Sequence, residues 1–119
     1  MRRHNFKKLK IWQDGMDLVD DTYALIIDFP REEKFNLSSQ LARCAVSIPS
    51  NIAEGTSKST DKHFNKYLED SLGSSFEWET QLIVAFRQGF ISKQRYDALE
   101  TKIQQLQKMI SGFQGRLTL

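Results

Sequence analysis

Apolar residues recur at alternating steps of three and four along this chain, and this spacing constrains its fold more than any other feature. The first such series is Leu9, Trp12, Met16, Val19, Tyr23 and Ile26. The last is Tyr96, Leu99, Ile103, Leu106, Ile110 and Phe113. This spacing aligns side chains along one side of an α-helix and matches the a and d positions of a heptad. We therefore predict long amphipathic helices at both ends of the chain, with both tryptophans and most of the phenylalanines in the core.

The first predicted helix carries a second apolar strip, and its end is clear. Ile11, Leu18 and Leu25 repeat every seven residues beside the main series, which predicts two packing partners for this helix. The residue before a proline avoids the helical region, so Phe29-Pro30 should end the helix.

The second predicted helix, from Asn36 or Ser38 to Gly55, contains a proline within its apolar stripe. That stripe is Leu37, Leu41, Cys44, Ile48 and Ile52. An interior proline such as Pro49 removes one backbone hydrogen bond and costs about 3 kcal/mol or more. We read the segment as a kinked core helix with a satisfied hydrogen-bond network or, alternatively, as a binding or assembly site. Gly55 is expected to act as a left-handed C-cap.

The third predicted helix begins at Ser59 or Thr60, ends at Gly89, and has a middle of small residues. These are Ser71, Gly73, Ser74 and Ser75. Small side chains let a neighbouring backbone approach, so the second helix should pack most closely here, near Pro49. Ser92 is the expected N-cap of the fourth helix.

Four helices joined by short connections predict an all-α fold, most simply an antiparallel up-down-up-down four-helix bundle. Two long helical hairpins packed as a dimer would give similar local signals. With 119 residues, 39% hydrophobic and 27% charged, the chain should form one domain over 1–119 with a short basic N-terminal arm. No apolar run approaches the roughly 20 residues of a bilayer span, so we expect a soluble, cytoplasmic protein without membrane partners. The single cysteine, Cys44, excludes an internal disulfide and should be a buried, inert thiol.

Charge is unevenly distributed, although the net charge is only +2. Residues 1–10 contain no acidic residue. Their cations are Arg2, Arg3, Lys7, Lys8 and Lys10. Residues 11–33 are acidic, and the balance becomes basic again after residue 80, including Arg116. Clustered cations attract phosphate backbones, which favours nucleic-acid binding. A solvated tail, or a contact with the acidic helix of a neighbouring subunit, would account for the same pattern.

Residues for catalysis are sparse. His4 and His63 stand at no metal-ligand spacing, and the chain lacks a nucleophile elbow and a glycine-rich phosphate loop. Glu54, Glu77 and Glu79 could supply carboxylates, but the Glu-x-x-His pattern of di-iron bundles is absent. We therefore expect no catalytic residue, no metal site and no cofactor.

Four strings along the chain are distinctive: Phe6-x-x-Leu9-x-Ile11-Trp12, Phe29-Pro30-x-x-Glu33, Leu37-x-x-Gln40-x-x-Arg43 and the specific Ser47-Ile48-Pro49-Ser50-Asn51-Ile52-Ala53-Glu54-Gly55. They resemble the family of bacterial 23S rRNA-intervening sequence proteins, which are four-helix bundles. The resemblance spans almost the whole chain. Phe76-Glu77-Trp78-Glu79 departs mildly from the Glu-Leu-Glu usual at this point, which makes the core more aromatic.

The family is similar in fold to the accessory variability proteins of diversity-generating retroelements, which are pentamers that bind a reverse transcriptase and nucleic acid. The resemblance therefore implies a homopentamer, and it implies RNA, DNA or a reverse transcriptase as partners. It does not settle a biochemical function.

Two functional hypotheses follow. In the first, the protein is a non-enzymatic RNA-binding accessory in which the arm cations, with Arg43 and Arg116, contact phosphates. In the second, it is a structural or protein-binding scaffold without nucleic-acid affinity. In both, we expect a polar network of motif residues to stabilise the bundle or its subunit interface rather than to touch RNA. This network is Gln40, Arg43, Ser47, Asn51 and Glu54.

Overall fold

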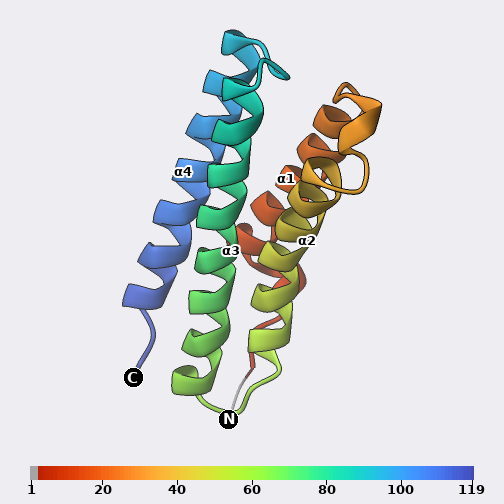
Figure 1. Ribbon diagram of the computed structural model, residues 1–119. Coiled ribbons are helices and arrows are strands. Elements are labelled where there is room, and N and C mark those ends of the chain that lie inside the picture. Colours follow the sequence, from red (N-terminus) through yellow and green to blue (C-terminus); the bar gives the residue numbers. More distant parts are fainter. Residues whose placement is uncertain (1–2) are drawn as a thin grey trace.

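The computed structural model describes residues 3–119 as four antiparallel α-helices. They are α1 (Lys10–Ile26), α2 (Leu37–Thr56), α3 (Asp61–Arg87) and α4 (Lys93–Gly115), with short 3-10 turns η1 (Phe6–Lys8) and η2 (Arg31–Glu33). Each helix packs on its neighbours in sequence, and α1 also contacts α4 (Figure 1). The described residues contain no strand. The predicted all-α, four-helix fold is confirmed.

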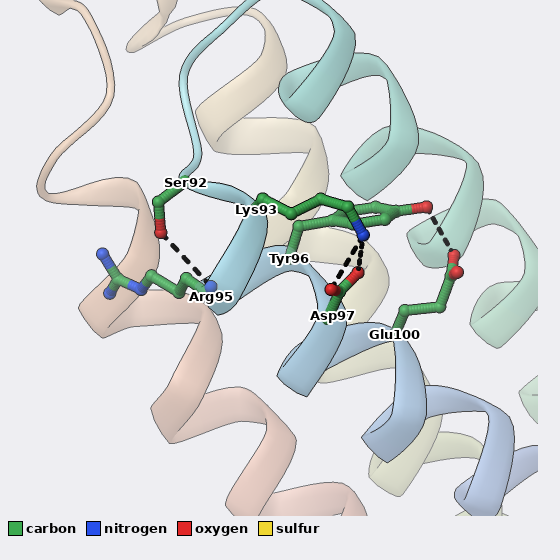
Figure 2. Close-up of polar contacts among 6 residues, drawn as sticks. All are labelled: Ser92, Lys93, Arg95, Tyr96, Asp97 and Glu100. Carbon is green, nitrogen blue, oxygen red and sulfur yellow. Dashed lines mark hydrogen bonds and ion pairs between the residues drawn. The ribbon is translucent and has the colours of Figure 1, made fainter.

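The helix ends follow the local signals in the sequence. Thr60 and Ser92 cap α3 and α4: their hydroxyls accept hydrogen bonds from the backbone N–H of His63 (3.1 Å) and Arg95 (3.2 Å). The second of these caps is visible in Figure 2. Gly89 ends α3 with φ +82°, and the following N–H, from Phe90, bonds the carbonyl of Ala85 at 2.9 Å, as in a Schellman motif.

Trp78 lies at the centre of the core and is fully buried. Its indole Nε1–H donates to Thr22 Oγ1 at 3.1 Å, and the Thr22 hydroxyl donates to the carbonyl of Leu18 at 2.6 Å. This chain of hydrogen bonds joins α3 to α1 and satisfies the polar groups that both side chains bring into the core. The more aromatic core expected at this position is therefore compatible with α1 because Thr22 supplies an acceptor.

The buried side of α1 is the second strip rather than the main series. Ile11, Leu18 and Leu25 are buried, together with the small residues Gly15 and Thr22. In the main series, by contrast, Met16 and Tyr23 are 39% and 51% exposed, whereas Leu9, Trp12, Val19 and Ile26 are partly buried. Gly15 and Thr22 lie in the same row as Ile11, Leu18 and Leu25. Because these two side chains are small, α2 and Trp78 can approach α1 along this row, which is therefore buried.

Two of the aromatic residues expected in the core lie at the surface. Phe35, in the connection between α1 and α2, is 87% exposed, and Phe76, on α3, is 52% exposed. Phe29 and Phe64 are buried as expected. Phe35 lies outside the helices, and Phe76 is two residues before Trp78 and therefore on the opposite side of α3, so these two are exceptions to the expectation that most phenylalanines lie in the core.

Pro49 packs against α1. An alanine Cβ built at Gly15 would lie 3.4 Å from Pro49 Cβ and 3.6 Å from Ile48 Cγ2, so the two helices are in van der Waals contact here. On the other side, Ser71 Oγ of α3 donates to the carbonyl of Ile48 at 2.9 Å. The predicted close approach of α2 and α3 thus occurs at Ser71.

Two predictions about glycines were wrong. Gly73 is exposed, and no atom lies within 4 Å of a Cβ built there, so it does not admit α2. Gly55 is not a left-handed cap, because α2 continues through Thr56 and Gly89 alone has a positive φ among the described glycines. Gly55 instead gives room to α3: a Cβ there would lie 2.7 Å from Phe64 Cδ1 and 2.9 Å from Tyr67 Cβ.

The start of α4 is held by side chains from neighbouring turns (Figure 2). Lys93 Nζ contacts both carboxylate oxygens of Asp97 at 2.8 Å. Tyr96 stacks on Phe86 with ring centroids 4.3 Å apart, and its hydroxyl donates to Glu100 Oε2 at 2.7 Å. This hydrogen bond raises the pKa of Tyr96 to about 12, because the neutral phenol is the donor.

Gly55→Ala should destabilise the protein, whereas Gly73→Ala should stabilise it. Alanine gains up to about 1 kcal/mol in helix propensity at either position. At Gly55, this gain is outweighed by overpacking against Phe64 and Tyr67, which typically costs about 1–3 kcal/mol. Thermal melts followed by circular dichroism check the pair. Equal shifts of Tm in the same direction would contradict the packing described for Gly55.

Glu100→Gln should lower the pKa of Tyr96 toward the ordinary tyrosine value of about 10. Since the pKa is raised in the folded protein, the hydrogen bond stabilises the fold fully below about pH 10, and this contribution is lost as the pH rises toward 12. Tyrosinate absorbance during alkaline titration measures the shift. Tyr96→Phe is the control and should remove the part of the absorbance change that titrates near pH 12. If that part persists, it belongs to another tyrosine.

Candidate nucleic-acid interface

Cations gather at one end of the bundle, where α1 and α3 begin and α2 and α4 end (Figure 1). We call this the basic end. Its cations are Arg3, Lys7, Lys8, Lys10, Lys58, Lys62, Lys66, Lys108 and Arg116. They outnumber the acids of the same half of the bundle, whereas acids outnumber cations in the opposite half. The fold therefore brings the basic arm together with cations from the later helices.

A groove of about 790 Å³ lies between α1 and α4 at this end. We call it the basic groove. Its lining combines exposed cations with buried or half-buried apolar residues: Lys8, Lys10, Lys108 and Arg116 with Leu9, Ile11, Met109 and Phe113. Thr101, Gln104, Gln105 and Gly112 complete it. The groove offers positive charge and apolar surface side by side.

Charge pairing differs along the contact between α1 and α4. Toward the opposite end, Lys102 pairs with Asp21, and Arg95 pairs with Asp28 at 2.8 Å. At the basic groove, neither Lys108 nor Arg116 has an ion-pair partner within residues 3–119. Asp21 and Asp28 are therefore paired within the chain, whereas Lys108 and Arg116 of the groove remain available to an anion.

The predicted arm cations have different surroundings. Lys10 pairs with Asp14 at 2.7 Å, and this hydrogen bond raises the pKa of Lys10. Arg3 Nε donates to the backbone carbonyl of Ser57 at 2.8 Å. Lys7 Nζ stands 6.0 Å from the ring centroid of Phe6. Among the arm cations, Lys8 and Lys10 reach the groove, and Lys10 is already paired.

The remaining predicted cations separate into two positions, and one lies outside the described residues. Arg116 lines the groove, with its guanidinium 5.6 Å from the ring centroid of Phe113. Arg43 is exposed on α2, outside the groove. Arg2 lies outside residues 3–119. Sequence reasoning missed Lys108, although its place eight residues before Arg116 puts both on one helix face.

The polar residues of the family-like string form two separate contacts between α2 and α3. Ser47 Oγ lies 2.9 Å from Ser74 Oγ, and Asn51 Nδ2 donates to Ser47 Oγ at 3.0 Å. Farther along, Gln40 Oε1 accepts from Gln81 Nε2 at 3.3 Å.

The other two members of the predicted network stand apart from these contacts. The side chains of Arg43 and Glu54 are exposed and form no hydrogen bond or ion pair with residues 3–119. The structure thus brings Ser47 and Asn51 together, and leaves Gln40, Arg43 and Glu54 outside their contact.

A protein-family model described as "23S rRNA-intervening sequence protein" matches residues 7–112. The chain belongs to this family. The match includes all of α1, α2 and α3, most of α4, and every lining residue of the basic groove except Phe113 and Arg116. The resemblance seen in the sequence is confirmed at the level of the family.

A solved structure supports the fold of this family member. It is the crystal structure of a protein of unknown function from the S23 ribosomal protein family of Bacteroides thetaiotaomicron VPI-5482. The two share 19% sequence identity with a TM-score of 0.78, over 87% of this chain and 97% of that one. Identity at this level supports a common fold and nothing finer. No curated protein matches the chain.

The other candidate chemistry of this family member is limited. Cys44 is buried, as predicted; burial first, and then the Glu77 carboxylate, raise the pKa of its thiol to about 11. The thiol is therefore protonated near neutral pH. Over residues 3–119, no group of three or more His, Cys, Asp and Glu side chains could hold a metal ion. None of the described helices is long and apolar enough to cross a bilayer.

Proposed function

We propose that the protein is a non-enzymatic, homo-oligomeric accessory protein that binds RNA through the cations of its basic end. The observation that supports this most is the basic groove, where Lys8, Lys108 and Arg116 are exposed without ion-pair partners among the described residues. Unpaired cations can neutralise phosphates and release the counterions that surround them. The family description, which refers to 23S rRNA, agrees with RNA as the polyanion. DNA offers a similar phosphate backbone.

An apolar surface on α1 supports assembly of the chain with itself. We call it the α1 outer stripe: Trp12, Met16, Val19, Tyr23, Ile26 and Ile27. Ile27 is 80% exposed, and Met16 and Tyr23 are also exposed. Burying apolar surface stabilises association by roughly 25 cal/mol per Å². Five subunits, as the resemblance implies, would repeat the basic end around one assembly and present several grooves to one RNA.

A scaffold without nucleic-acid affinity is the second candidate. It is favoured by two strongly exposed apolar side chains near the connection between α1 and α2, Ile27 and Phe35. Larger exposed apolar patches mark protein-binding surfaces, and these two side chains would contribute to such a patch. In this case the partner would be a protein, such as a reverse transcriptase, and the charges of the basic end would serve assembly.

Replacing Lys8, Lys108 and Arg116 with Ala should weaken RNA binding and flatten its salt dependence. The slope of log affinity against log salt should fall by about 0.7–0.9 for each phosphate contact removed. The measurement is fluorescence anisotropy with a labelled rRNA fragment over a series of salt concentrations. The matched control is Arg31, Lys34 and Arg87 to Ala, which removes the same charge from the opposite end of the bundle. If both triple variants lose affinity equally, the binding depends on the net charge of the protein and not on the cations of the basic end.

Met16→Glu with Tyr23→Glu should break the oligomer. Carboxylates on the α1 outer stripe would be buried and unpaired in the assembly, whereas they are solvated in the monomer. Size-exclusion chromatography with light scattering should show a multiple of 13.8 kDa for the natural chain and a monomer for the variant. Phe76→Glu, at an exposed phenylalanine of α3, is the control and should leave the assembly intact. A natural chain that is monomeric at all concentrations would refute the oligomer.

A further inference from the structure

The basic groove presents apolar surface in addition to the cations that would bind a phosphate backbone. Its cations suit any polyanion, but its apolar residues suit only a partner with an apolar face. Ile11 is 4% exposed, and Leu9, Met109 and Phe113 are partly buried at the same lining. In a duplex the faces of the bases are stacked and only the backbone and groove edges are accessible. Unpaired nucleotides present base faces and phosphates together.

The aromatic residue of the groove, Phe113, is held in place by neighbouring rings. The Phe113 ring meets Phe64 and His4 edge-on, with centroid distances of 5.6 Å to each. The guanidinium of Arg116 lies over the same ring. Phe113 is partly buried and also lines the groove, so an oriented ring and a planar cation adjoin the open space. Both groups stack on nucleobases in single-strand binding sites.

The groove also has room at a point where a side chain is missing. Gly112 lines it in the middle of the last turns of α4, and no atom lies within 4 Å of a Cβ built there. Gly112 lies four residues after Lys108 and four before Arg116, so it separates the two cations on one helix face. A planar group such as a nucleobase can therefore reach the apolar surface of the groove between Lys108 and Arg116, each of which could bind a phosphate.

We propose that the basic groove binds an unpaired segment of nucleic acid, with a base against Phe113 and Met109 and the flanking phosphates at Lys8, Lys108 and Arg116. This inference rests on the proposed nucleic-acid binding and assigns its substrate class. The exposed amide of Gln105, which can both donate and accept, is available to the edge of the bound base.

The test compares four forms of one probe: a single-stranded RNA of about 12 nucleotides, the matching duplex, the same strand with abasic sites, and a single-stranded DNA of equal sequence. Sites of this type cover roughly 4–16 nucleotides. Fluorescence anisotropy at fixed salt should give single-strand RNA binding about tenfold tighter than duplex binding. The abasic strand should lose this advantage, because it keeps the phosphates and lacks the base.

Gly112→Leu tests the groove itself. Leucine should fill the space beside Phe113 without changing the charge, and should weaken single-strand binding about tenfold, a much larger loss than for the duplex, whose binding depends on the unchanged cations. Gly73→Leu is the matched control, since it is also an exposed helical glycine with no atom near a built Cβ. Leucine favours a helix more than glycine, so both variants should fold, as circular dichroism can verify. Gly112→Met gives a second filling side chain with a different shape.

The outcomes separate this inference from the proposed function. Equal affinity for single strand and duplex, with no effect of Gly112→Leu, would overturn the assignment of unpaired nucleic acid and leave binding at the basic end intact. No affinity for any of the four probes at low salt would overturn both. Equal affinity for the RNA and DNA strands would support the groove, and would show that it does not read the 2′-hydroxyl.

Discussion

The packing at Ile48 and Pro49 is the constraint on which the arrangement of the first three helices depends. Proline has no N–H to donate, and its ring needs space beside the helix. Gly15 of α1 provides that space, and Ser71 of α3 bonds the carbonyl of Ile48 from the other side. The unusual proline-containing string is thus explained by contacts between helices. It holds α2 between α1 and α3, and Trp78 then closes the core by its hydrogen bond to Thr22.

The contact between α4 and α1 is of a different kind. It depends in part on exposed ion pairs, Arg95 with Asp28 and Lys102 with Asp21. Ion pairs of this type typically contribute only about 0–1 kcal/mol each. Where the pairs end, the two helices leave the basic groove. The candidate interface therefore lies at the surface beside this contact, where exposed side chains can change without disturbing the buried core.

Local signals in the sequence predicted the four helices and most of their ends, because caps such as Thr60, Ser92 and Gly89 act within a few residues. They did not show which of the two apolar strips of α1 would be the more deeply buried. The outcome was decided by the small size of Gly15 and Thr22, which matters only once α2 and α3 are in place. The same applies to Gly55, whose neighbours Phe64 and Tyr67 come from the next helix. Of the groove cations, Lys8, Lys10 and Arg116 were predicted. Their position beside Lys108 was not, because it depends on how α4 packs against α1.

The separation of charge between the two ends has a consequence for how the molecule moves before binding. In an antiparallel bundle the helix macrodipoles largely cancel, so the side chains determine the field along the 48 Å long axis. A molecule that is positive at one end and negative at the other has a permanent electric dipole moment. Near a polyanion, this dipole experiences a torque that turns the positive end forward while the partners are still separated by solvent. In the proposed binding of RNA, more of the random collisions would then become productive, and the association rate constant would fall as ionic strength rises.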